Sequence, residues 1–136
     1  MNGLAVLTVA LPAAALLAWA VTKLNGRFRD KSGTDVLTAD DLGRPLGERA
    51  TLIHFSSAFC APCRATRVLL ADIAAKTPGV VTIEIDAEER LELTRQLNIL
   101  RTPTVLVLDS KGRVTRRASG LPRREQVLAA LDLAVA

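Results

Sequence analysis

Apolar and polar residues follow two different patterns along this chain. Residues 3–22 form one uncharged run rich in leucine, alanine and valine. As a helix with a rise of about 1.5 Å per residue, this run spans roughly 30 Å, the thickness of the hydrocarbon core of a bilayer. From residue 51 onward, short apolar runs rich in β-branched residues alternate with longer segments of helical periodicity. The pattern predicts one long apolar helix followed by an α/β domain.

The alternation also gives the expected elements of the domain. Strands are predicted at residues 51–56, 80–85, 104–108 and 113–118, and helices at residues 38–42, 60–76, 88–97 and 122–135. The strand–helix–strand order of the first three strands predicts parallel crossovers, and a turn at residues 109–112 predicts a closing antiparallel hairpin. We therefore expect a mixed central sheet with helices on both faces.

Two of these helices have an apolar face that should contact the sheet. Helical spacing predicts that the core positions of the helix at residues 60–76 are Ala65, Val68, Leu69 and Ile73. In the last helix the same spacing selects Val127, Leu131 and Ala134.

The N-terminal run has two interpretations, a retained membrane anchor and a cleaved signal peptide. Ala18-Trp19-Ala20 resembles a signal cleavage site, but Met1-Asn2 lacks the basic residues that precede the apolar segment of a signal peptide. Pro12 lies inside the run and is tolerated in a membrane helix. We therefore expect a transmembrane anchor over residues 1–24, a juxtamembrane linker over residues 25–35 and one domain over residues 36–136.

Charge is concentrated beside the anchor. Residues 23–31 contain four basic residues and one acidic residue, whereas the remaining residues 32–136 are nearly neutral. Basic residues that flank a membrane helix tend to stay in the cytoplasm. The predicted location is therefore a single-pass protein of the cell membrane with a cytoplasmic domain, and an extracytoplasmic domain is the alternative. The nearly neutral domain gives no reason to expect nucleic-acid binding.

The two cysteines of the chain, Cys60 and Cys63, lie between a predicted strand and a predicted helix. A C-x-x-C pair at such a junction is typical of a thiol–disulfide redox site, because the positive end of the helix dipole stabilises a thiolate there. A four-ligand zinc site is not expected, since the chain has no second C-x-x-C and only one histidine, His54. A static disulfide or a pair of inert thiols is the plainer alternative.

The chain resembles the thioredoxin superfamily over residues 36–136. The resemblance rests on Phe59-Cys60-Ala61-Pro62-Cys63 after a strand, Asp86 at the end of the next strand, Thr102-Pro103-Thr104 before the third, and Gly120 before the last helix. It implies that Cys60 is the exposed nucleophile, that Cys63 is the buried resolving cysteine, and that the pair needs no bound cofactor or metal. Asp86 is expected to have a structural role, capping the helix that starts near residue 88.

The resemblance also implies a substrate surface around a cis-proline. The Thr102–Pro103 peptide bond is expected to be cis and to face the cysteine pair. An ordinary trans proline at the start of an edge strand is the alternative. The expected substrate-binding residues are Phe59, Ala61, Pro62, Thr102, Pro103 and Gly120. Arg101 adds a positive charge beside this surface, where the family often has a glycine.

His54 is the main departure from the family, which usually has a buried aspartate at this position. An imidazole could accept the proton of Cys63, and burial would lower its pKa and keep it neutral. A buried histidine with no catalytic part is the alternative.

Together these features predict a thiol–disulfide oxidoreductase of cell redox homeostasis at the membrane surface. Its partners would be protein disulfides and a separate reductase or electron donor. A non-catalytic module that binds a membrane partner or copper(I) through the two thiols is the alternative from another class. An extracytoplasmic enzyme of cytochrome maturation or oxidative folding would keep the same chemistry on the other side of the membrane.

Overall fold

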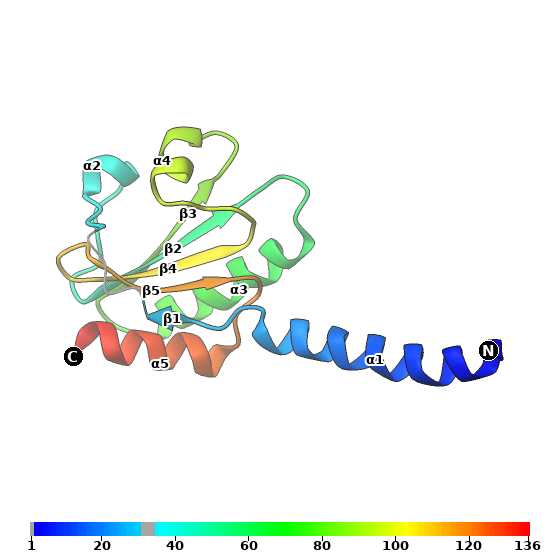
Figure 1. Cartoon of the computed structure of the whole chain (residues 1–136). Coiled ribbons are helices and arrows are strands. Elements are labelled where there is room, and N and C mark those ends of the chain that lie inside the picture. The colour runs from blue at the N-terminus through cyan, green and yellow to red at the C-terminus, as the bar shows by residue number, and fades with distance from the viewer. Residues whose placement is uncertain (1, 31–34) are drawn as a thin grey trace.

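A computed structural model describes residues 2–30 and 35–136. The N-terminal helix α1, Gly3–Leu24, extends away from the domain with no buried residue (Figure 1). Within the described residues it is one helix that is long and apolar enough to cross a membrane, a property it shares with signal sequences.

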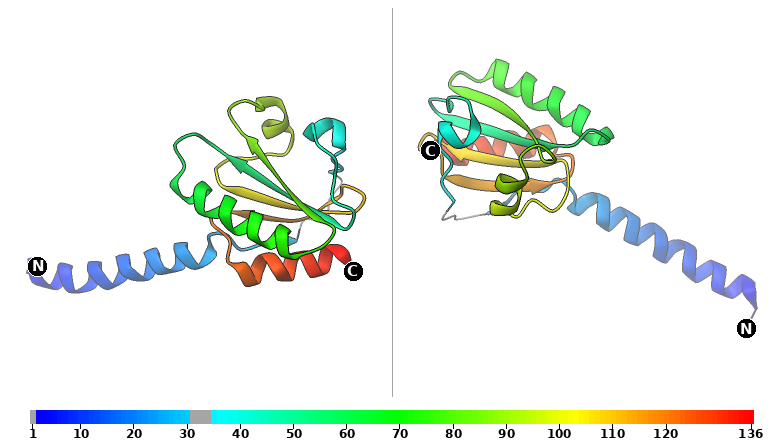
Figure 2. Two further views of the ribbon diagram at one scale, coloured as in Figure 1. Left: turned by 180° about the vertical axis from the view of Figure 1, so that it is seen from behind. Right: turned by 90° about the horizontal axis from the view of Figure 1, so that it is seen from above.

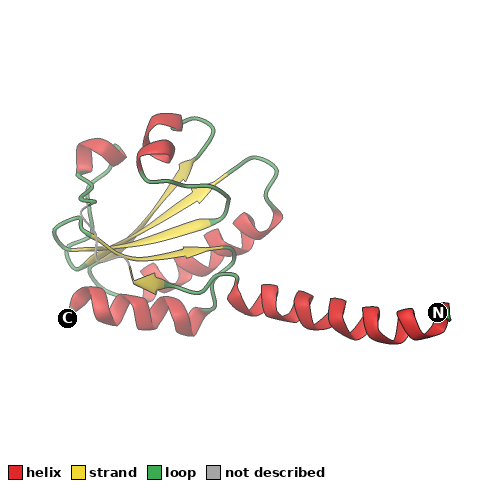
Figure 3. Ribbon diagram, in the orientation of Figure 1, coloured by secondary structure: helices red, strands yellow, loops and turns green. Residues whose placement is uncertain are grey.

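The domain is built on a mixed sheet, which in the described residues has five strands in the order β1-β5-β4-β2-β3 (Figure 3). The strands are β1 Arg29–Asp30, β2 Ala50–Ser56, β3 Val80–Asp86, β4 Thr104–Asp109 and β5 Val114–Ser119. The helices of the domain are α2 Ala39–Leu42, α3 Ala61–Lys76, α4 Leu91–Gln96 and α5 Arg124–Val135. The mixed sheet with helices that the sequence predicted is therefore confirmed.

Helices cover both faces of the sheet (Figure 2). On one face, α3 and α5 pack on β2 and β4 through a buried cluster that includes Leu52, Leu70, Ile73, Val127 and Leu131. On the other face, a second cluster around Phe55 and Ile83 includes Leu42 of α2, Leu93 of α4 and Leu97, which directly follows α4. Burial of these apolar side chains is the main favourable contribution to folding.

One predicted strand direction was wrong. β2 and β3 are parallel, as expected, but β4 pairs antiparallel with β2. A β4 parallel to β2 would need a connection that crosses the sheet from one edge to the other. The connection over residues 87–103 instead returns to the edge where β3 ended, so β4 runs back from there.

The predicted core face of α3 was also partly wrong. Val68 is 65% exposed and Ala65 is exposed, while the buried row is Cys63, Thr66, Leu70 and Ile73. The buried row was missed in the sequence because it contains a polar residue, Thr66. The Thr66 hydroxyl can be buried because it donates a hydrogen bond of 2.9 Å to the Pro62 carbonyl. In α5 the predicted core residues Val127, Leu131 and Ala134 are buried.

The segment expected as a linker, residues 25–35, contributes to the sheet. β1 pairs antiparallel with β5 in the register Arg29 opposite Arg117. Residues 31–34 of the expected linker lie outside the described residues. The division into anchor, linker and domain stays a prediction.

Candidate active site

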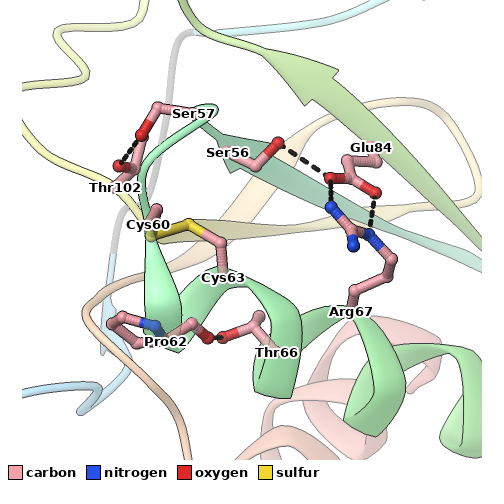
Figure 4. Close-up of polar contacts among 9 residues, drawn as sticks. All are labelled: Ser56, Ser57, Cys60, Pro62, Cys63, Thr66, Arg67, Glu84 and Thr102. Carbon is pink, nitrogen blue, oxygen red and sulfur yellow. Dashed lines mark hydrogen bonds and ion pairs between the residues drawn. A yellow bond between two sulfur atoms is a disulfide. The ribbon is translucent and has the colours of Figure 1, made fainter.

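The two cysteines lie where β2 gives way to α3, and they are joined by a disulfide (Figure 4). Cys60 is the N-cap residue of α3 and Cys63 lies in the first turn, so their Cα atoms are 5.2 Å apart. Cys60 is half-buried, whereas Cys63 is 1% exposed. An incoming substrate can therefore reach the sulfur of Cys60 but not that of Cys63.

The first turn of α3 keeps the pair at the positive end of the helix. The Cys63 N–H donates to the Cys60 carbonyl at 3.2 Å. Pro62 lies in this first turn, directly before Cys63. The N–H groups of a first helical turn have no partner within the helix, and proline has no N–H. The helix dipole therefore acts directly on the sulfur atoms.

The Thr102–Pro103 peptide bond is cis, as the resemblance implied. Its loop is held to the redox loop by a hydrogen bond of 2.9 Å between the hydroxyls of Ser57 and Thr102. It is held to the loop after β5 by the Gly120 N–H, which donates to the Pro103 carbonyl at 2.7 Å. These contacts join three loops that are distant in the sequence.

The expected substrate surface lies at one edge of the sheet. The loop after β2 carries Phe59, which is fully exposed, and α3 begins with Ala61 and Pro62, which are also exposed. β4 begins directly after Pro103, and Gly120 directly follows β5. The structure thus brings the six residues to the same end of the domain. Their contact with a substrate stays a prediction.

His54 is almost completely buried, at 1% exposed, in the middle of β2. It lies on the same strand face as Leu52, which packs with Leu70 and Ile73 of α3. His54 lies two residues after Leu52, about 6.6 Å further along β2. Because α3 runs back along β2, this advance matches about four residues toward the N-terminus of α3, or about 6 Å. His54 therefore faces the turn of α3 that precedes Leu70, between Cys63 and Thr66.

The imidazole of His54 has neither of its nitrogens hydrogen-bonded to any atom of the described residues. Burial lowers its pKa to about 4; the charge of Glu84 raises it and that of Arg67 lowers it further. His54 is therefore neutral at pH 7.

Glu84 completes a charged group that the sequence analysis did not assign to the site. It is the register partner of His54 on β3 and accepts hydrogen bonds of 2.6 Å from both Nε and Nη2 of Arg67 and of 2.8 Å from the Ser56 hydroxyl (Figure 4). The Arg67 hydrogen bonds, opposed by partial burial, hold the Glu84 pKa at about 2. An acidic residue between Ile83 and Ile85, on the strand beside the histidine, was the signal in the sequence.

Asp86 does not cap a helix. Its carboxylate accepts a hydrogen bond of 2.8 Å from the Glu88 N–H, and its carbonyl accepts from the N–H groups of Glu89 and Arg90. Since α4 begins only at Leu91, the predicted capping role was wrong, and Asp86 instead stabilises the turn that leaves β3.

The described residues contain no group of three histidine, cysteine or acidic side chains that could hold a metal ion. When reduced, Cys60 and Cys63 are the soft ligands that copper(I) would require. The expectation that the pair works without a cofactor stays a prediction.

Comparisons with known proteins agree with this geometry. Thioredoxin from Alicyclobacillus acidocaldarius is 33% identical over 86 residues, which are 62% of this chain and 81% of that protein. Human thioredoxin domain-containing protein 2 is 30% identical over 100 residues, which are 71% of this chain but 18% of that protein. The rice thioredoxin H5 is 28% identical over 72 residues, 53% of each chain. The chain thus spans about half or less of the length of several curated relatives it matches.

Solved structures show the same fold at low identity. A thioredoxin mutant from Halobacterium salinarum superposes with a TM-score of 0.60 at 18% identity, covering 65% of this chain and 77% of the other. Thioredoxin f from spinach chloroplast gives a TM-score of 0.58 at 22% identity, covering 66% and 80%. The family model for thioredoxin matches residues 36–132, which is more than half of the chain. The chain therefore belongs to the thioredoxin family.

Proposed function

We propose that this protein is a membrane-anchored thiol–disulfide oxidoreductase that exchanges disulfides with protein substrates. The observation that carries the proposal is the arrangement of the cysteine pair. A half-buried Cys60 is disulfide-bonded to a buried Cys63 at the first turn of α3, in a domain whose Thr102–Pro103 bond is cis. The thioredoxins it resembles support the same activity.

The reaction begins with the reduced pair. The Cys60 thiolate, stabilised by the N-terminus of α3, attacks one sulfur of a substrate disulfide. A Cys60–substrate disulfide forms, the substrate S–S bond breaks, and the leaving sulfur takes up a proton. Cys63 then attacks the sulfur of Cys60, which releases the second substrate thiol and forms the Cys60–Cys63 disulfide. Two electrons pass to the substrate, and a separate reductase must return two electrons to the pair.

His54 is the group we propose for the proton of Cys63. The imidazole is neutral at pH 7, because burial lowers its pKa to about 4, so its free nitrogen can accept the proton as the Cys63 sulfur attacks. A base with so low a pKa holds the proton only briefly. The neighbouring carboxylate of Glu84 stabilises the imidazolium during that time.

The anchor would confine this chemistry to a membrane surface. α1 is long and apolar enough to span a bilayer, and the basic residues that follow it favour a cytoplasmic domain. Labelling Cys60 of a Cys63→Ser variant in whole cells with a membrane-impermeant thiol reagent tests this side. Protection in intact cells and labelling after lysis are expected. Labelling in intact cells would place the domain outside.

Trapping of mixed disulfides tests the activity itself. A Cys63→Ser variant cannot complete the second step, so it should accumulate covalent adducts between Cys60 and its substrates, and a Cys60→Ser,Cys63→Ser variant should accumulate none. If the single variant traps no protein and the reduced wild-type chain instead binds copper(I) tightly through both thiols, the binding-module alternative holds and the proposal is wrong.

A further inference from the structure

The chain enters the domain at the edge of the sheet that carries the redox pair. β2 ends at this edge and β4 begins there, and β5, antiparallel to β4, ends there at Ser119. β1 is antiparallel to β5 and so begins at the same edge. Because α1 ends at Leu24, just before β1, the anchor leaves from this edge. Figures 1 and 2 show α1 and the start of α3 at the same end of the domain in three views.

The junction between α1 and the domain is held by the loops of the site. The Gly26 N–H donates to the Ser119 carbonyl at 2.6 Å, and the Asn25 side-chain oxygen accepts a hydrogen bond of 2.8 Å from Arg101, which directly precedes Thr102. A Cβ on Gly120 would lie 3.1 Å from the Gly26 nitrogen. The loops that flank the redox pair therefore fix the direction in which the anchor leaves.

The same edge exposes apolar side chains. Phe59, Leu100 and Leu121 are 101%, 90% and 44% exposed, and they lie after β2, before β4 and after β5. An apolar surface of this kind is typical of a site that contacts a membrane or a protein.

Arginines accompany these apolar residues. A cavity of about 320 Å³ next to the end of α1 is lined by Leu24, Arg27, Leu100, Arg101 and Arg117, among others. Guanidinium groups beside leucines suit the boundary between acyl chains and phosphate headgroups. This composition at the edge therefore suits contact with a bilayer surface.

We propose that the redox pair faces the bilayer, and that its substrate is a disulfide in a surface-lying segment of another membrane protein. β2 is three strand spacings from β1, about 14 Å along the edge, so Cys60 lies close to the point where the anchor enters the membrane. A large soluble protein would have to enter between the domain and the bilayer, whereas a membrane-bound segment is already there. The inference rests on the oxidoreductase activity proposed above.

A lipid-linked disulfide tests the direction in which the pair faces. The full chain is reduced, freed of reductant and incorporated into vesicles that contain phosphatidylethanolamine with a pyridyl disulfide on a short headgroup tether. Cys60 attacks the probe and releases pyridinethione, which is measured by its absorbance. Cys63 then releases the lipid thiol, so two electrons leave the pair for each probe. A soluble pyridyl disulfide reports the number of accessible pairs and their intrinsic reactivity.

The decisive variant has a flexible Gly-Ser insertion of about fifteen residues between Leu24 and Asn25. If the pair faces the bilayer, the insertion should lower the rate with the lipid-linked probe about tenfold, because the effective concentration of the probe falls. It should leave the rate with the soluble probe unchanged. The same insertion between Met1 and Asn2 is the control and should change neither rate.

Two other outcomes have distinct meanings. An unchanged or increased rate with the lipid-linked probe, at an unchanged rate with the soluble probe, would overturn the inference, because a pair that faces away from the bilayer gains access from the insertion. If the reduced wild-type chain fails to react with the soluble probe, the proposed oxidoreductase activity is itself wrong, and the inference falls with it.

Discussion

The buried imidazole of His54 should make the stability of the oxidised protein depend on pH between about 4 and 6.5. Its pKa is about 4 in the folded protein and about 6.5 in the unfolded chain. The unfolded state therefore binds more protons in this window, so the free energy of unfolding is highest above pH 6.5 and falls as the pH is lowered. The difference gives a loss of about 2 kcal/mol at pH 5 and about 3 kcal/mol at pH 4.

Two substitutions separate this effect from other titrations. His54→Leu removes the titrating group and the two unpaired buried nitrogens, so it should abolish the loss between pH 6.5 and 4.5 and add about 1–3 kcal/mol at pH 7. His54→Asp should reverse the sign: burial raises the pKa of a carboxyl group above its unfolded value of about 3.9, and the stability is then lost as the pH rises through the folded pKa. Glu84 leaves the range between pH 4.5 and 6.5 clear, because its lowered pKa changes stability only below about pH 4.5.

The assay is urea unfolding of the oxidised full chain in mild detergent, followed by far-ultraviolet circular dichroism at several pH values. Tryptophan fluorescence is not suitable, because the single tryptophan, Trp19, lies in α1. If the wild-type chain loses the same free energy between pH 7 and 5 as His54→Leu, or if His54→Asp loses stability toward acid in that window, then His54 is not a desolvated neutral imidazole and the reasoning is refuted.

Three further substitutions test neighbouring parts of the structure. Glu84→Gln should lower the pKa of His54 further and slow the resolving step in single-turnover kinetics, while the first attack by Cys60 keeps its rate. Gly112→Ala should lower the unfolding midpoint far more than Gly43→Ala. Both glycines have positive φ, but only at Gly112 would a Cβ meet a backbone oxygen, at 2.1 Å. Asp109→Ala removes the acceptor of three hydrogen bonds in the β4–β5 turn and should cost about 2–3 kcal/mol in urea unfolding, whereas Ser110→Ala should be neutral.

Local sequence was sufficient where one short segment determines its own structure. The apolar strand before Cys60, the helix after it and the glycine turn at the end of β4 were all predicted from neighbouring residues, and the family resemblance added the cis bond at Pro103. The direction of β4 was not predicted, because alternation of strands and helices does not say at which edge of the sheet a connection ends. The antiparallel pairing of β4 with β2 shows that this connection returns to the edge where β3 ended.

Contacts between distant segments account for the rest. The two residues of β1 have low strand propensity. They form a strand because they pair with β5, which is distant in the sequence. The bond between Asn25 and Arg101 joins residues 76 positions apart, and the bond between Ser57 and Thr102 joins residues 45 positions apart. No local pattern marks such pairs, since each side chain is polar and unremarkable in its own segment.

The replacement of the family's aspartate by His54 changes the electrostatics of the reduced pair. Reduction leaves a thiolate on Cys60 at the N-terminus of α3, where the helix dipole stabilises it. Above its raised pKa, a buried carboxylate at this position would be ionised, and it would repel that thiolate and favour the disulfide. A neutral imidazole does not, and Glu84, the acidic residue that acts on His54, is paired with Arg67. The reduced form is therefore favoured relative to the same domain with an aspartate, so this pair should be the better acceptor of electrons, and a His54→Asp variant the better donor.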